Sequence, residues 1–270
     1  MIISRLTMKN NEVRQAGIGS LILKKSTLVS NRDTPSVSVV MPAYNEEEGI
    51  GQVVDGFSNE LKSMNISHEI IVVDNNCIDK TAEIAVKHGA RVVLEKRQGY
   101  GFACKTALSE AQGDFIILTE SDKTFDPKDI WKILMYLEED DIDFVLGTRT
   151  TLELLERGAK MDWFLHWGNI FLAKLIQIQF WGHARLTDVG CTFRGIKRES
   201  AHKVLDKITD GGSCFSPEMI MWCLKMDMRP IEIPVKYLKR EGQSKITVNK
   251  RKSFFLGLRM IKLIISQRFW

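Results

Sequence analysis

Short apolar runs alternate with amphipathic segments from residue 37 onward. The runs are rich in β-branched and aromatic residues and are bounded by polar turns, which predicts strands. The segments between them carry apolar residues three and four positions apart, which predicts helices. Strands that alternate with helices indicate an α/β fold, with a Rossmann-like, mainly parallel sheet covered by helices on both faces. The predicted strands are Val37–Met41, Ile70–Val73, Arg91–Leu94, Phe115–Leu118 and Phe144–Leu146.

Two of the predicted helices have clear sequence signals. The first lies between the first two strands, where Ile50, Val53, Val54, Phe57, Leu61 and Met64 form one apolar face. The second follows Asp126-Pro127, a capping residue and a proline suited to the first helical position. Its apolar face consists of Ile130, Ile133, Leu134 and Leu137.

Length and composition are those of a globular protein. The chain has 270 residues, of which 44% are hydrophobic and 27% charged, which excludes a disordered or low-complexity protein. It is long enough to bury a core without disulfides or a structural metal. The 5 cysteines contain no C-x-x-C pair, so we expect neither a disulfide framework nor a zinc site, and a reducing compartment fits best.

Charge is distributed unevenly along the chain. The segment 236–270 holds ten Lys and Arg against one acid, which leaves 28 basic and 33 acidic side chains in the rest. We expect this basic segment to meet phosphates. Three regions are predicted: a polar extension over 1–35, a catalytic domain over 36–249 and a basic amphipathic tail over 250–270.

No stretch of the sequence matches a membrane span or an export signal. Two apolar stretches with polar interruptions, Trp163–Trp181 and Phe254–Ile265, have the composition of helices that lie in a membrane interface. The alternative is that both pack inside the protein or in a dimer.

Polar and acidic residues follow four of the predicted strands. Because carboxyl ends of parallel strands lie at one edge of a sheet, where ligands bind, these residues are expected to converge. Glu120-Ser121-Asp122 is the most informative group, since two carboxylates after a buried strand offer hard oxygen ligands to Mg²⁺ or Mn²⁺. The four groups are Pro42–Glu47, Asp74–Asn76, Thr119–Asp122 and Gly147–Arg149.

A partial glycine motif, Gly99-Tyr-Gly-Phe-Ala-Cys104, follows the third strand. Cys104 stands where a dinucleotide-binding fingerprint has its last glycine, so a dehydrogenase is not favoured. The glycines are expected to allow a tight turn or a close approach to a nucleotide. His166 and His183 lack metal-ligand spacing.

The motifs together resemble a family 2 glycosyltransferase of the GT-A fold. The resemblance lies in Val39–Glu47, Ile71–Asp74, the Glu-Ser-Asp triplet and Gly147-Thr-Arg149. Three later segments are similar to the polyprenyl-phosphate (dolichol-phosphate) sugar transferase branch: Leu186–Arg194, Ser216–Met219 and Arg240–Lys245. Residues 37–262 follow the pattern in order.

The resemblance implies donor-site roles. Pro42, Ala43, Tyr44 and Glu46 would line the nucleobase and ribose pocket, with Asp74 on the base. Asp122 would bind the metal at the donor diphosphate, with Glu120 and Ser121 beside it. Glu120 departs from the usual Asp-x-Asp, which affects the local geometry and the preferred donor. Arg240 and Lys245 resemble the diphosphate clamp.

On the acceptor side, Arg149 resembles the residue that holds a lipid phosphate, which an Arg fork grips well. A phosphate acceptor is largely ionised at neutral pH and requires no general base. A hydroxyl acceptor would require one, and Asp188 and Glu218 are the candidates. Glu218 follows Ser216-Pro217, a helix opening where an acid can simply complement the dipole.

The leading hypothesis is an inverting, metal-assisted hexosyltransferase that uses a GDP- or UDP-sugar and a polyprenyl phosphate. It would be cytoplasmic and peripherally associated with the inner face of the membrane, with a homo-oligomer left open. The alternatives are transfer to a glycan or soluble hydroxyl and a non-catalytic nucleotide-sugar-binding protein. A nucleic-acid binder is not favoured, because the body is acidic and no reading module is present.

Overall fold

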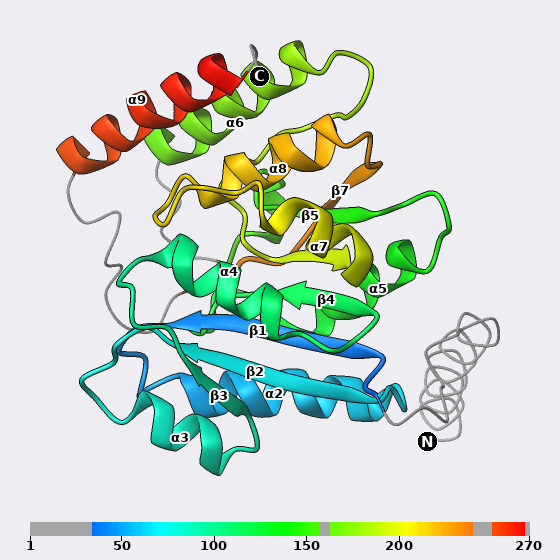
Figure 1. Cartoon of the computed structure of the whole chain (residues 1–270), viewed down its shortest axis with the longest axis vertical. Coiled ribbons are helices and arrows are strands. Elements are labelled where there is room, and N and C mark those ends of the chain that lie inside the picture. The colour runs from blue at the N-terminus through cyan, green and yellow to red at the C-terminus, as the bar shows by residue number, and fades with distance from the viewer. Residues whose placement is uncertain (1–33, 157–162, 240–249, 268–270) are drawn as a thin grey trace, which may run out of the picture.

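The computed structural model describes residues 34–156, 163–239 and 250–267. In these residues a single mixed sheet has the strand order β3-β2-β1-β4-β6-β5-β7 (Figure 1). The strands are β1 (Val37–Ala43), β2 (His68–Asp74), β3 (Arg91–Leu94), β4 (Phe115–Leu118), β5 (Phe144–Thr148), β6 (Arg194–Lys197) and β7 (Pro230–Pro234). The helices are α2 (Ile50–Ser63), α3 (Thr81–Lys87), α4 (Tyr100–Glu110), α5 (Ile130–Leu137), α6 (Trp163–Gln179), α7 (Arg198–Leu205), α8 (Phe215–Lys225) and α9 (Lys250–Ser266), with 3-10 turns η2 (Pro127–Asp129) and η3 (Leu152–Leu154).

The α/β prediction and all five predicted strands are confirmed. β1 pairs in parallel with β2 and β4, and β2 pairs in parallel with β3. β6 runs antiparallel to both β4 and β5, so β5 points the same way as β4. The carboxyl ends of β1, β2, β4 and β5 therefore lie at one edge, as the convergence of polar residues requires.

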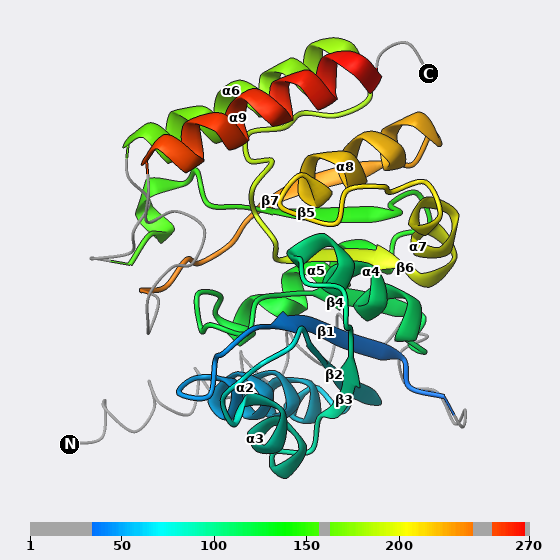
Figure 2. The ribbon, with the colours of Figure 1, turned by 60° about the vertical axis from the view of Figure 1, so that its left-hand side comes forward.

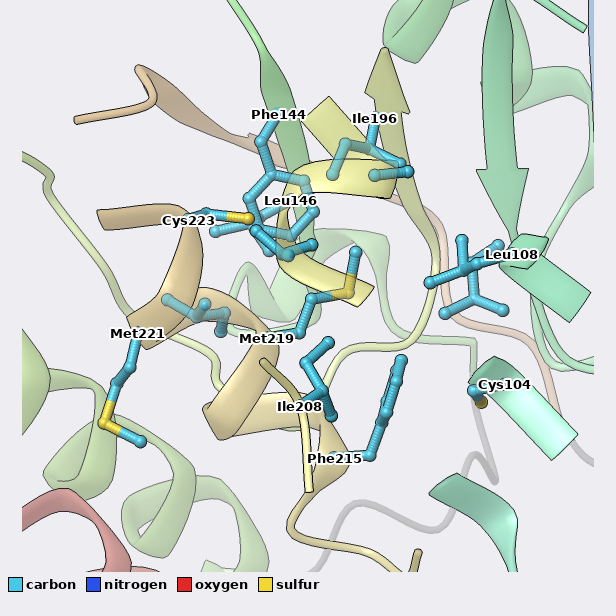
Figure 3. Close-up of a cluster of buried hydrophobic side chains, with 14 of the residues drawn as sticks. Cys104, Leu108, Phe144, Leu146, Ile196, Ile208, Phe215, Met219, Met221 and Cys223 are labelled. Carbon is cyan, nitrogen blue, oxygen red and sulfur yellow. The ribbon is translucent and has the colours of Figure 1, made fainter. Parts of the chain in front are cut away.

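Helices cover both faces of the sheet, which explains why strand β1 is buried at every position. Alternate side chains along β1 point to opposite faces: Val40 belongs to one hydrophobic cluster, and Val39 and Met41 belong to the other. The first cluster lies beneath α4, α7 and α8, and Figure 3 shows Phe215 and Met219 of α8 in it. The second lies beneath α2, α3 and α5.

The two interface candidates form α6 and α9, which lie side by side on the outside of the molecule (Figure 2). α9 also packs against α8. Each helix buries one side: Leu172, Ala173 and Ile176 of α6 and Ile264 of α9 belong to the core. Their outer sides expose large apolar residues: Trp167, Phe171 and Ile178 on α6, and Phe254, Phe255, Leu258 and Ile265 on α9. Neither of these, nor any other helix in the described ranges, has the length and apolar character needed to cross a bilayer.

Candidate active site at the carboxyl edge of the sheet

The acidic turn after β4 is held by a short set of hydrogen bonds. The Oδ1 atom of Asp122 accepts bonds from the backbone nitrogen of Thr124 at 3.1 Å and from its hydroxyl at 2.5 Å. Lys123, between them, has a left-handed φ of 64°. The hydroxyl of Ser121 donates to the carbonyl of Pro42 at 2.9 Å, which joins the turn to the end of β1. Only 6% of Asp122 is exposed, so its carboxylate is placed with little freedom.

Glu120 lies in the same turn, and its Oε1 atom accepts a bond from the Tyr100 hydroxyl at 3.1 Å. Tyr100 is the first residue of α4. No group of three or more acidic, His or Cys side chains suited to a metal occurs among the described residues. Glu120 and Asp122 would offer two carboxylates from the described part of the chain, which fits an ion that completes its coordination with waters and a substrate diphosphate.

The loops after β1 and β2 are interlocked. The carbonyl of Ala43 accepts from the backbone nitrogen of Asn75, and Asp74 Oδ1 accepts from that of Cys77 at 2.7 Å. Asn45 has a left-handed φ of 54°, and its side-chain oxygen accepts from the nitrogen of Ile78. Burial raises the pKa of the Cys77 thiol to about 11, so it remains neutral.

These bonds bring the predicted donor residues of the two loops to one place. The backbone nitrogen of Glu46 donates to the Thr81 hydroxyl at the start of α3. Tyr44 is 39% exposed at the same edge, where an aromatic ring could meet a base. Pro42, through its bond from Ser121, connects this edge to the acidic turn.

Arg149 and Asp188 form a buried ion pair at the end of β5. The Nε and Nη2 atoms of Arg149 donate to the two carboxylate oxygens of Asp188 at 2.8 and 2.9 Å, and the Arg149 backbone nitrogen donates at 3.1 Å. The side chains are 14% and 0% exposed. Burial alone would raise the pKa of Asp188, but the charge and hydrogen bonds of Arg149 lower it below its ordinary value.

The loop that carries Asp188 is fixed by two groups that the sequence analysis did not single out, one half-buried and one fully buried. Glu232 of β7 accepts bonds from the backbone nitrogens of Thr187 and Asp188, both at 2.9 Å. Arg194, 1% exposed, donates to the carbonyls of Val189, Cys191 and Ser216. The loop therefore presents Asp188 to Arg149 in one orientation.

Glu218, the other candidate base, is in a different environment. It is 0% exposed on the first turn of α8 and accepts bonds from the nitrogen and hydroxyl of Thr209 and the nitrogen of Asp210. None of these bonds reaches Glu120, Asp122 or Arg149. Arg240 and Lys245, the predicted diphosphate clamp, lie outside the described residues.

Tyr237 contacts Arg149 and forms a backbone bridge with Phe125, three residues after Asp122, and the sequence analysis missed it. The Cζ atom of Arg149 is 5.3 Å from the centroid of the Tyr237 ring. Burial raises the pKa of the phenol, Arg149 opposes that rise, and the charges of Asp122 and Glu120 add to it. The sequence signal for Tyr237 was weak. It is an aromatic residue three positions before Arg240, in a segment that was interpreted from its basic charge.

The glycine motif at the start of α4 serves a close approach to another part of the chain. The carbonyl of Gly211 accepts bonds from the nitrogens of Gly101 and Phe102, at 2.9 and 3.2 Å. A Cβ at Gly101 would lie 2.3 Å from the Asp210 carbonyl oxygen. Tyr100, the first residue of α4, donates a hydrogen bond to Glu120. The close contact between α4 and residues 210–211 therefore helps to position Tyr100 beside the acidic turn.

We expect Gly101→Ala to lower the free energy of unfolding by about 1–3 kcal/mol, because the added methyl group must displace backbone. Gly257→Ala in α9 is the control: nothing lies within 4 Å of its Cβ position, so it should be neutral or slightly stabilising. Urea denaturation of both variants measures the difference. Equal stabilities would show that the 210–211 loop yields without cost.

Comparison with known proteins decides the family. A sequence profile described as glycosyl transferase family 2 matches residues 38–205. The chain belongs to glycosyl transferase family 2. The match spans β1 to α7 and includes the acidic turn and the Arg149–Asp188 pair, so the family resemblance seen in the sequence is confirmed.

Two relatives from Haloferax volcanii extend the comparison. The low-salt glycan biosynthesis hexosyltransferase Agl6 is 33% identical over 231 residues, which cover 86% of this chain and 53% of that protein. The chain thus spans about half the length of this relative. A dolichyl-phosphate hexose transferase is 30% identical over 211 residues, covering 78% of this chain and 86% of the relative.

A solved structure supports the GT-A fold. Glucosyl-3-phosphoglycerate synthase from Mycobacterium tuberculosis, in complex with Mn²⁺, UDP-glucose and phosphoglyceric acid, matches with a TM-score of 0.66. The match covers 87% of this chain and 80% of that one at 18% identity. Such a likeness shows the fold alone.

Proposed function

We propose that this protein transfers a hexosyl group from a nucleotide sugar to a polyprenyl or dolichyl phosphate, with inversion at the anomeric carbon. The observation that carries the proposal is the buried Arg149–Asp188 pair at the same sheet edge as the acidic turn. A guanidinium fixed there suits an anionic acceptor, which would face a donor diphosphate. The dolichyl-phosphate hexose transferase relative supports this acceptor class.

The donor would bind across the ends of β1, β2 and β4. Pro42 to Glu46 and Asp74 would hold the nucleoside, and Glu120 and Asp122 would hold a divalent ion, Mg²⁺ or Mn²⁺. When bound, such an ion neutralises the charge that develops on the leaving diphosphate. The M. tuberculosis synthase, which has the same fold, has been solved with Mn²⁺ and UDP-glucose in one complex, and this supports the use of a divalent ion with a nucleotide sugar. Arg240 and Lys245 remain proposed contributors to the same task.

The candidate bases favour a phosphate acceptor over a hydroxyl acceptor. Asp188 has a lowered pKa and both of its oxygens bond Arg149, which makes it a weak base. Glu218 is fully buried and occupied by Thr209 and Asp210. A phosphate monoester, with a second pKa near ~6, is already the nucleophile at neutral pH and needs in-line placement only.

The exposed side of α6 and α9 would rest on the membrane that holds the lipid. Trp167 and Phe171 of α6 and Phe255 of α9 are more than half exposed. Lys262 of α9 is an exposed cation, whereas the 63% exposed Arg259 pairs with Asp210. Amphipathic helices of this kind bind anionic lipid surfaces. We propose a peripheral association with the cytoplasmic face.

The test is a donor and acceptor panel with the full chain. GDP- and UDP-sugars are offered with Mn²⁺ or Mg²⁺ and vesicles that contain a polyprenyl phosphate, and products are identified by mass spectrometry. We expect a lipid-linked hexose whose formation stops with EDTA. Sugar transfer to a soluble hydroxyl acceptor with no lipid product would overturn the proposed acceptor, and nucleotide binding without any transfer would overturn the activity.

A further inference from the structure

We propose that Tyr237 is a positioning residue that holds the Arg149 guanidinium toward the acceptor and away from the acidic turn. The inference rests on the proposed function, because it takes Arg149 as the group that meets the acceptor. Arg149 carries a positive charge, and Glu120 and Asp122 carry negative charges at the same sheet edge. Asp188 already restrains the Arg149 guanidinium, and the Tyr237 ring is a second group in contact with it.

Backbone hydrogen bonds and β-bridges connect Tyr237 to both sides of the site. On one side it forms an antiparallel bridge with Phe125, and the nitrogen of Leu238 donates to the Thr124 carbonyl at 2.8 Å. On the other side it forms a parallel bridge with Leu155. There the Tyr237 nitrogen donates to the Leu154 carbonyl at 3.1 Å, and its carbonyl accepts from Glu156 at 2.9 Å.

Each set of backbone bonds connects Tyr237 to a chain segment that lies next to a site residue. Thr124 is the residue whose backbone nitrogen and hydroxyl bind Asp122. Leu154 and Leu155 follow Arg149 along the chain, just after the end of β5. Tyr237 is therefore the point where the segment after the acidic turn and the segment after Arg149 meet. A shift of its backbone would move both.

The ring of Tyr237 completes the arrangement. One neighbour is Phe125, whose centroid is 5.6 Å away and which itself packs on Phe193 at 5.3 Å. The other is the Arg149 guanidinium, 5.3 Å from the ring centroid, within the range of a cation–π contact. Since Asp188 holds the Nε and Nη2 atoms of Arg149, the guanidinium is restrained by a carboxylate and by a ring.

The ring also has charged groups of both signs near it. Both Glu120 and Asp122 act electrostatically on the phenol, and so does Arg149, which places the neutral ring within reach of both groups. In a partly buried site the attraction between opposite charges is several times stronger than in water. If the ring were removed, the guanidinium could turn toward the acidic turn, and the acceptor would lose its cation.

The experiment compares steady-state kinetics of full-length variants. Tyr237→Leu removes the ring, and Tyr237→Phe keeps the ring and removes the hydroxyl. Phe125→Leu is the matched control, because Phe125 is the other neighbour of the Tyr237 ring and its own ring partners are Tyr237 and Phe193. Tyr237→Met replaces the leucine variant if that does not fold. The acceptor is whichever compound the wild type glycosylates in the panel above.

We expect Tyr237→Leu to raise the acceptor KM about ten-fold with the donor KM unchanged within about two-fold, the loss expected for one cation–π restraint. Tyr237→Phe and Phe125→Leu should keep the wild-type acceptor KM. In an Arg149→Lys background, Tyr237→Leu should add less than about two-fold, because the residue acts through Arg149.

Three results would overturn the inference: an equal rise in donor and acceptor KM, the same defect in Phe125→Leu, or full additivity with Arg149→Lys. The proposed function fails separately. If the wild type glycosylates a hydroxyl compound in place of a polyprenyl phosphate, the acceptor class is wrong, and the kinetic pattern with that compound still decides the role of Tyr237.

Discussion

Asp122→Asn is expected to lower kcat by about 100- to 1000-fold while leaving the protein folded. The amide oxygen of Asn can still accept the two bonds from Thr124, so the turn keeps its shape. The negative charge is lost, and with it half of the carboxylate pair proposed to hold the divalent ion. Losing one preorganised electrostatic contact to a transition state typically costs this much. Initial rates at saturating Mn²⁺ measure the effect.

Asp126→Asn is the matched control for this variant. Asp126 lies four positions later and caps the 3-10 turn η2, with its side chain accepting from the nitrogen of Lys128. An Asn there preserves the cap and leaves the acidic turn untouched. It also removes the charge that pairs with the half-exposed Lys236, a pair expected to contribute less than about 1 kcal/mol. It should retain wild-type rates. If Asp122→Asn kept more than about a tenth of wild-type kcat, the acidic turn would not hold the ion.

The strands of this fold could be predicted where their side chains are uniformly apolar, and were missed where they are not. β6 reads Arg-Gly-Ile-Lys and has no apolar run. Its arginine is buried through bonds to the carbonyls of Val189, Cys191 and Ser216. β7 begins and ends with proline and lies at the edge of the sheet, the position where proline is tolerated. The burial of this arginine and the edge position of β7 both depend on tertiary contacts, which the spacing of apolar residues along the chain does not reveal.

Part of the candidate site could likewise be predicted from the sequence, and part could not. The clustering of Pro42, Asp74, Glu120 and Arg149 could be predicted, since parallel strands bring their carboxyl ends together whatever the loops do. The partner of Arg149 could not, because Asp188 lies 39 residues away in an irregular loop. Tyr237 was hidden for the same reason: its role depends on bridges to Phe125 and Leu155 that only the folded chain brings about.

Arg149→Ala is expected to cost about 3–5 kcal/mol of the free energy of unfolding at pH 7, in addition to abolishing transfer to the acceptor. The change leaves the fully buried Asp188 carboxylate without its cation, and breaking one partner from a buried pair has this cost. Arg229→Ala is the control, since the Arg229–Asp141 pair is 65% and 79% exposed and should contribute less than about 1 kcal/mol. Urea denaturation measures both.

The pH dependence of the stability lost in Arg149→Ala distinguishes two causes. One is the loss of the charge that pairs with Asp188, and the other is the loss of packing. In the wild type the lowered pKa of Asp188 means that its contribution to stability is present at neutral pH and is lost as the pH falls through that lowered value. In the variant, burial without Arg149 raises the pKa of Asp188, so protonation relieves the buried charge as the pH falls. The stability difference from the wild type should therefore shrink between about pH 7 and pH 4. A difference that stays constant over this range would mean that Arg149 stabilises the fold by packing, and that the buried ion pair is not what fixes it at the edge of the sheet.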